Sequence, residues 1–180
     1  MRNSRFKVYK CGRYVKTQVH QERQDIMGVD RNIKIRLATD CSYFSIILIA
    51  LTLSIYSFNK DGTITSLTED DVDDYEYKQF ESFNVVKQIL DKREEKGLAN
   101  YIVLLDSDID DSFLVSSRKL DSSYLDYKNQ YELNFSIGHG VRIKGAERYT
   151  DFSAYINKLI PLLSSKVGYI CEISCTDFDC

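Results

Sequence analysis

Hydrophobic and polar positions alternate along the chain in short blocks, and the first clear block lies near its middle. Leu51, Leu53 and Ile55 are separated by single residues, a period of two that predicts a strand with one buried face. Residues 59–62 then supply turn chemistry, and a second β-favouring stretch follows. We therefore expect a core hairpin over residues 43–67, with these three side chains buried.

The same region is also the one candidate for a membrane span. Residues 41–59 carry no charge, and nineteen residues are just enough for a transmembrane helix. Six of the nineteen are Ser, Thr or Asn, and Asp40 and Lys60 close the two ends. Together with the period of two, this composition favours the hairpin, and we expect no stable membrane insertion.

A helix is predicted next, from a capping-box-like start at Thr68 and Asp71. Apolar residues recur at helical spacing up to Leu90, and basic residues precede a stop at Gly97. A short apolar run at 101–105 predicts a buried strand, which a polar loop over Asp106–Ser117 follows.

The C-terminal third predicts three strands and a helix. Two of the strands are expected at 131–137 and 141–144, joined across a turn that contains two glycines. The helix that follows contains Pro161 within its apolar pattern, so we expect it to end or kink there. A strand over 167–173 closes the series.

The chain of 180 residues is interpreted as one domain, with a basic N-terminal segment at 1–40 and a main core at 41–180. Within the segment, 5–15 and 33–37 show strand-like alternation, and 18–27 has the pattern of a polar helix. Strands and helices are interspersed without strict βαβ alternation. We therefore predict an α+β fold, with packed helices on a mixed or mainly antiparallel sheet.

The composition supports an ordered core and excludes several classes. Hydrophobic residues make up 43% of the chain, which is enough to bury a sizeable core. One Pro and eight Gly are too few for a collagen-like or linker-rich chain. No fixed-period repeat is visible, which excludes solenoids and propellers.

Charge is distributed unevenly behind a net value of −3. Residues 1–36 hold ten basic and three acidic side chains, and residues 61–111 hold five basic and fifteen acidic ones. The basic segment alone suggests binding to nucleic acid or to an anionic membrane surface. The acidic region that follows is equally able to neutralise it within the fold. Because the pI of about 5.5 is low for a nucleic-acid binder, we expect no nucleic-acid partner.

Cysteine usage points to a reducing compartment. The count is five, which is odd, and no signal peptide is recognisable, so we expect free thiols and a cytoplasmic protein. Cys171, Cys175 and Cys180 with His139 do not have the spacing of a zinc knuckle. We therefore expect neither a metal nor another cofactor.

Catalytic motifs are not recognisable in the sequence. Neither histidine lies in a nucleophile–base pattern, and no phosphate-binding loop is present. The loop with Asp106, Asp108 and Asp110 approaches a calcium-loop pattern but lacks its glycine and its closing glutamate. We expect a non-enzyme; the alternative is a hydrolase without a known motif that uses Asp106, Asp108 and His139.

Two acidic stretches, Thr68–Glu76 and Asp106–Asp111, dominate the polar surface expected of this chain. In whole-chain character (acidic, rich in Tyr, Ser and Asp, without catalytic motifs) it resembles the bacterial immunity proteins of contact-dependent growth inhibition systems. The resemblance implies that the chain binds a cognate toxin domain, often a nuclease, and blocks it. A carboxylate surface suits that task, since nucleases carry basic clefts for phosphate backbones.

The resemblance also implies where a toxin would bind. Acidic and aromatic side chains of the two stretches are one candidate surface, and the edge of the hairpin over 131–144 is the other, since immunity proteins of this class accept toxin strands. A solvated helix face is the alternative for the first stretch. The expected contact residues are Glu69, Asp70, Asp71, Asp73, Asp74, Tyr75, Glu76, Tyr77, Asp106, Asp108, Asp110, Tyr131 and Asn134.

Overall fold

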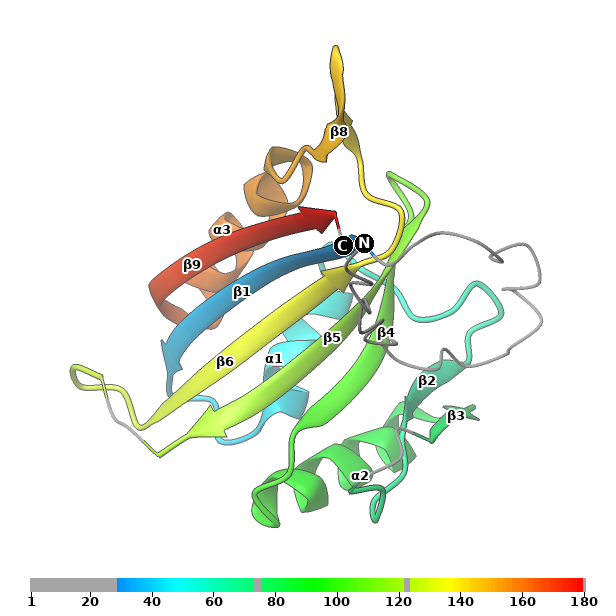
Figure 1. Cartoon of the computed structure of the whole chain (residues 1–180). Helices are drawn as coiled ribbons and strands as arrows, with labels where there is room; N and C mark the ends of the chain where they lie inside the picture. The colour runs from blue at the N-terminus through cyan, green and yellow to red at the C-terminus, as the bar shows by residue number, and fades with distance from the viewer. Residues whose placement is uncertain (1–28, 73–75, 122–123, 180) are drawn as a thin grey trace, which may run out of the picture.

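Seven strands pair into one antiparallel sheet in the computed structural model, which describes residues 29–72, 76–121 and 124–179 (Figure 1). In the order in which they lie side by side, the strands are β3 (Tyr77–Phe80), β2 (Ile64–Leu67), β4 (Asn100–Asp106), β5 (Asp111–Leu120), β6 (Asn129–Ile137), β1 (Val29–Thr39) and β9 (Gly168–Asp179). Each of the six pairings is antiparallel.

Three helices of the described chain pack against this sheet: α1 (Phe44–Thr52), α2 (Phe83–Glu95) and α3 (Ser153–Lys166). They cover one face of it, with α1 behind the central strands (Figure 1). Their apolar side chains form a single core cluster with those of the strands, such as Ile35, Val115 and Phe135. The structure therefore confirms the predicted α+β fold with an antiparallel sheet.

Two short strands, β7 (Arg142–Ile143) and β8 (Ala146–Thr150), form a separate hairpin that projects from the body (Figure 1). The sequence predicts that 141–144 pairs with 131–137, and this pairing is wrong. β6 lies between β5 and β1, so both of its edges already have neighbours. For the same reason the predicted edge at 131–144 does not exist on β6.

The remaining strand predictions are confirmed for residues 33–37, 101–105 and 131–137, which lie inside β1, β4 and β6. The strand expected at 167–173 is also present, and it extends further as β9. β4 differs in one respect: instead of being buried throughout, it alternates between buried and half-buried residues. One of its faces meets the helices, and the other is the face that the described helices leave uncovered.

The hairpin predicted over 43–67 is wrong at its start, where α1 forms instead. Phe44, Ile47, Leu48 and Leu51 are fully buried, and their spacing is that of one helix face. Leu53 follows the helix and is 81% exposed. The period of two misleads because Leu51 is the last buried residue of the helix face, whereas Leu53 and Ile55 lie in the turn that follows the helix. No helix in the described part of the chain is long and apolar enough to cross a membrane.

The helix predicted from Thr68 begins only at Phe83, and the intervening residues include β3. Thr68 does not cap a helix: it lies in the loop after β2, where its backbone carbonyl oxygen accepts a hydrogen bond from Arg93 of α2. The predicted stop at Gly97 agrees with the structure, where α2 ends at Glu95 and Gly97 has a φ of 71°.

The polar loop predicted over Asp106–Ser117 is wrong beyond its first residues. Asp106 pairs with Asp111 across a tight turn, and β5 then runs through the serines. Alternate residues such as Phe113 and Val115 are buried, a pattern that the polar composition hides. Asp110 closes the turn with a φ of 49°, a conformation that aspartate tolerates better than most residues.

The sequence predicts that the helix ends or kinks at Pro161. In the structure α3 does not end there and continues to Lys166. Proline removes one backbone donor there, and its exposed side chain disturbs no core contact. The predicted elements at 5–15 and 18–27 lie outside the described residues, as do the cysteines Cys11 and Cys180. Cys41, Cys171 and Cys175 are free thiols.

Candidate functional site

The acidic segment, residues 69–76, connects β2 to β3 beside the C-terminal half of α2. Its first carboxylate, Glu69, accepts hydrogen bonds from Lys92 at 2.9 Å and from Lys96 at 3.1 Å. Asp70 also accepts one from Lys96, at 2.9 Å, while its side chain remains 88% exposed. These lysine hydrogen bonds lower the pKa values of Glu69 and Asp70 below their ordinary range.

A buried arginine fixes the backbone that leads into the acidic segment. Arg93 is 2% exposed, and its Nη1 donates to the carbonyl oxygens of Thr68 and Asp71, each at 2.7 Å. Its Nε and Nη2 donate to the carbonyl oxygen of Ala99. Burial lowers the pKa of the guanidinium, whereas the charge of Asp71 opposes this effect. The start of the acidic segment is thus held from within the domain.

The negative charge of the acidic segment exceeds the positive charge that α2 brings to it. Residues 69–76 contain six acidic side chains and no basic one. Four of the six, Glu69, Asp70, Asp71 and Glu76, lie among the described residues. Against these four, α2 supplies Lys92 and Arg93, and Lys96 follows directly after the helix. Among the described residues, one negative charge therefore remains in excess. Among the predicted contact residues here, Glu76 is exposed and Tyr77 half-buried; Asp73, Asp74 and Tyr75 lie outside the described residues.

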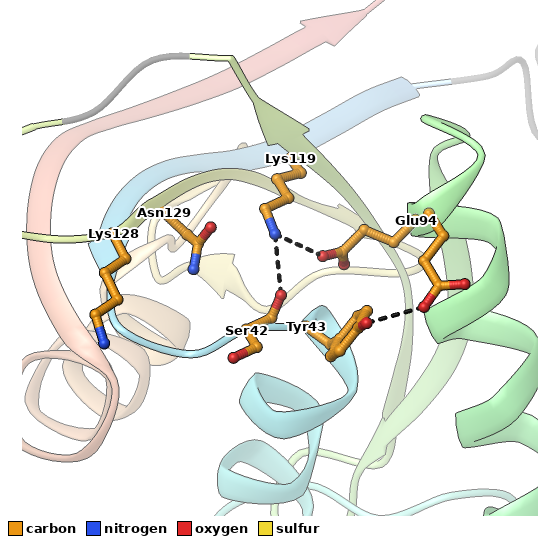
Figure 2. Close-up of a pocket in the computed structure, with 7 residues that line it drawn as sticks. Ser42, Tyr43, Glu94, Lys119, Lys128 and Asn129 are labelled. Carbon is orange, nitrogen blue, oxygen red and sulfur yellow. Dashed lines mark hydrogen bonds and ion pairs between the residues drawn. The ribbon is translucent and has the colours of Figure 1, made fainter.

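On its other side, α2 borders a pocket of about 400 Å³ (Figure 2). The pocket lies between the start of α1, the end of α2 and the facing ends of β5 and β6. Its lining residues are polar or charged: Ser42, Tyr43, Glu94, Glu95, Lys119, Lys128 and Asn129. The acidic segment and this pocket therefore flank the same C-terminal half of α2.

Lys119 and Glu94 organise the back of the pocket. The Lys119 ammonium donates to the Ser42 carbonyl oxygen at 3.0 Å and lies 3.4 Å from Glu94 Oε1 (Figure 2). Near the opening, the Tyr43 hydroxyl donates to Glu95 at 2.9 Å, and this hydrogen bond raises the pKa of Tyr43. Opposite charges thus line the pocket, with Glu94 and Glu95 facing Lys119 and Lys128.

Glu94 is almost completely buried and serves as the N-terminal cap of α1. Its Oε2 accepts the Phe44 N–H at 2.9 Å, and its Oε1 accepts the Tyr131 hydroxyl at 2.6 Å. The residue preceding α1, Tyr43, makes no side-chain cap of its own. A carboxylate at this position also complements the helix dipole. Glu94 is therefore bound on all sides by the fold and is not poised as a catalytic base.

The second acidic stretch lies at the opposite end of β4 from the acidic segment, about 20 Å away for a strand of this length. Lys158 of α3 donates to both oxygens of the buried Asp106, at 2.9 and 3.0 Å, and to Asp108 at 2.8 Å. Lys60 binds Asp110 at 2.7 Å and lowers its pKa. The sheet therefore does not bring the two predicted acidic stretches into one site.

Tyr131 and Asn134 do not form the predicted edge. The Tyr131 side chain is fully buried, so it cannot contact a partner, and burial together with the Glu94 hydrogen bond raises its pKa. Asn134 lies on the uncovered face of the central strand β6, where it donates to Asn32 and Ser136. The sequence predicts that both residues are accessible, because it places their strand at an edge of the sheet. β6 instead lies between β5 and β1.

The alternative hydrolase is expected to use Asp106, Asp108 and His139. The His139 side chain is exposed, while its backbone N–H donates to Asp111. Asp106 and Asp108 share the ammonium of Lys158, whose single charge offsets one of their two. Among the described residues, no three His, Cys, Asp or Glu side chains are grouped to hold a metal ion.

The described part of the basic N-terminal segment is paired within the sheet. Arg31 lies 3.7 Å from Asp177, Lys34 lies 3.3 Å from Glu132, and Arg36 lies 3.2 Å from Glu172. The sequence leaves open that the acidic residues of 61–111 neutralise the basic segment within the fold. The described basic residues are indeed paired within the fold, but their acidic partners lie on β6 and β9.

Sequence reasoning missed the pocket, because its lining comes from four separate segments that no local pattern connects. The charged residues near Gly97 were visible as helix-ending signals only. Comparison of the chain with protein-family models, with curated proteins and with solved structures yields no match.

Proposed function

We propose that the protein is an immunity protein, which binds a basic toxin domain in the cytoplasm and occludes its active-site cleft. A nuclease is the toxin class that this chemistry suits best, because a cleft for a phosphate backbone is lined by cations. The observation that carries the proposal is the acidic segment itself: Arg93 holds its start beside α2, and its described carboxylates outnumber the cations next to them by one.

The internal ion pairs of the acidic segment are compatible with this role. Asp70 is 88% exposed, and Lys96 is half-exposed beside it. Exposed pairs of this kind contribute little to stability, so a toxin cation can replace the lysine at little cost. The lysines keep the carboxylates in place until then, which reduces the entropy lost on binding.

The pocket beside α2 adds a concave surface next to the charged acidic segment. Tyr43 at its rim and Glu95 beside it form a polar, partly aromatic recess on the flank of the acidic segment. Aromatic side chains at such positions are typical anchors of protein interfaces. A toxin domain lying across α2 would contact the acidic segment and place a side chain in this recess.

The proposal is tested by the rate of association with a partner captured from the source strain. The double substitution Glu69→Gln/Asp70→Asn is expected to slow association by roughly tenfold at low salt and to flatten its salt dependence, because long-range steering is lost. The matched control is Glu147→Gln/Asp61→Asn, which removes one exposed charge from β8 and one from the turn before β2, at the end of β2 opposite the acidic segment.

The two variants distinguish the proposal from nonspecific charge effects. If both double variants slow association equally, the acidic segment is not the contact surface. If the captured partner has no activity that the wild-type protein inhibits, the immunity function itself is contradicted.

A further inference from the structure

The longest strand of the sheet lies at its edge. β9 spans twelve residues and pairs with β1 on one side, and no other described strand lies on its second side (Figure 1). Natural edge strands are protected from pairing by Lys, by Pro or by their shortness. Residues 168–179 contain neither Lys nor Pro. Of the known protections of edge strands, β9 therefore lacks Lys, Pro and shortness, and it retains acidic residues and one register shift.

The backbone of β9 presents hydrogen-bonding groups to a further strand. In an antiparallel pair, every second residue points its N–H and C=O away from its neighbour. One register shift occurs opposite Arg36 and Leu37, and from Glu172 to Asp179 the pairing with β1 is uninterrupted. These eight residues thus offer an outer edge with regular spacing.

Most side chains along β9 are uncharged. Tyr169 is 47% exposed, Ile173 is 39% exposed, and Cys175 is exposed. Of the three acidic residues on the strand, two are paired with β1: Glu172 with Arg36 at 3.2 Å, and Asp177 with Arg31 at 3.7 Å. The third, Asp179, is the last residue of the strand. This surface therefore does not attract a basic partner, which separates it from the acidic segment beside α2.

We propose that β9 pairs antiparallel with β9 of a second copy of this chain, around a twofold axis at Ile173. Ile173 lies at the middle of Gly168–Asp179, so this register pairs residues 168–178 of the two copies, with the register shift of β9 at Cys171 on each side of the axis. It places the two Ile173 side chains opposite each other and Glu172 opposite Ser174. Axes at Glu172 or Asp177 would instead place two carboxylates opposite each other, which is unfavourable.

Self-complementarity is the reason for choosing a second copy rather than a foreign strand. Around this axis, the exposed Ile173 side chain of one copy packs against that of the other, and no two acidic residues lie opposite each other. A twofold interface uses the same patch on both copies, which is the commonest arrangement in soluble homodimers. The seven-stranded sheet then continues from one copy into the other.

The first test is the mass of the purified full chain by sedimentation equilibrium at micromolar concentration, without any partner. The wild-type protein is expected to be a dimer, and Ile173→Lys a monomer, because two ammonium groups would face each other at the axis. Val85→Lys adds the same charge at an exposed site on α2, which packs on β2, β3 and β4 at the other edge of the sheet, and should remain a dimer. Thermal melting confirms that each variant is folded.

The second test is covalent capture of the register. Ile173→Cys is expected to form a 173–173 disulfide on mild oxidation, since opposed residues in an antiparallel pair lie at about the Cα separation that a disulfide needs. Leu53→Cys is the control and should not form the equivalent dimer.

A monomeric wild-type chain, or a dimer that survives Ile173→Lys, would overturn the proposal. Protection of β9 from hydrogen exchange only after a toxin is added would also overturn it, and would assign the edge to a foreign strand. Both results are independent of whether the acidic segment binds a toxin, so the two proposals can fail separately.

Discussion

One carboxylate, that of Glu94, holds together two helices and two strands. It belongs to α2, caps α1 through the Phe44 N–H, accepts the Tyr131 hydroxyl from β6 and faces Lys119 from β5. The Tyr131 hydroxyl and the Lys119 ammonium also donate to the Ser42 carbonyl oxygen, whereas the Phe44 N–H donates to Glu94. Because Glu94 is buried, removing its charge weakens this network of donors at several points at once.

Glu94→Gln should lower the free energy of unfolding by about 2–3 kcal/mol, since an amide cannot accept from all three donors and leaves Lys119 without its counter-charge. Denaturant titration measures the change. The neighbouring Glu95→Gln is the control, because Glu95 is exposed, and it should change stability by less than about 0.5 kcal/mol. Equal effects of the two substitutions would contradict the capping role.

The lysine pairs of the acidic segment predict a pH dependence with a defined sign. Lysine hydrogen bonds lower the pKa values of Glu69 and Asp70 in the folded protein from ordinary values of 4.5 and 3.8. The unfolded chain therefore takes up protons at higher pH than the folded one. The stabilisation is present above these ordinary values and is lost as the pH falls through the lowered ones.

Lys96→Gln should accordingly reduce the melting temperature most at neutral pH, with an effect that shrinks as the pH falls below the ordinary pKa values of the two carboxyl groups and they take up protons. Lys166→Gln is a suitable control, because the Lys166 ammonium donates to the neutral Ser54 hydroxyl. Its effect should not vary with pH over this range. A Lys96→Gln effect that is constant with pH would show that these ion pairs do not act as described.

At the scale of elements, α1 is where sequence and structure differ most. Its buried residues lie on one helical face, and the residue just after the helix, Leu53, is exposed. A strand through the same region would bury Leu51 and Leu53 on the same face. Single substitutions therefore discriminate between the two structures.

Leu51→Ala should cost about 2–5 kcal/mol, the usual range for a large-to-small change in a core. Leu53→Asp should cost less than about 0.5 kcal/mol, as expected of an exposed position. Thermal or chemical unfolding measures both values. A cost of several kcal/mol for Leu53→Asp would restore the strand and contradict α1.

Strands in which apolar and polar residues alternate could be predicted from the sequence, whereas the strands with which they pair could not. The strand patterns at 33–37 and 131–137 reflect one buried face, a local property that survives in β1 and β6. The position of β6 between β5 and β1 depends on long-range pairing, as does the start of α2 after β3. Local patterns do not encode these contacts.

At the scale of the whole molecule, the same division applies to the candidate site. Charge density located the acidic segment, because a run of carboxylates is visible in any arrangement of the chain. The lysines that hold it come from α2, more than twenty residues later, and the pocket joins four segments. Tyr131 was wrongly predicted to be a contact residue. Whether an aromatic residue in a strand is exposed or buried depends on neighbouring segments that the local sequence does not identify.

The central claim, that the protein neutralises a basic toxin domain through the acidic segment, is tested most directly by titrating the toxin's own activity. The captured toxin domain is assayed with increasing amounts of the purified wild-type protein. We predict that activity falls linearly and is abolished at one equivalent, and that Glu69→Gln/Asp70→Asn needs an excess. Full activity in the presence of excess wild-type protein would contradict the account.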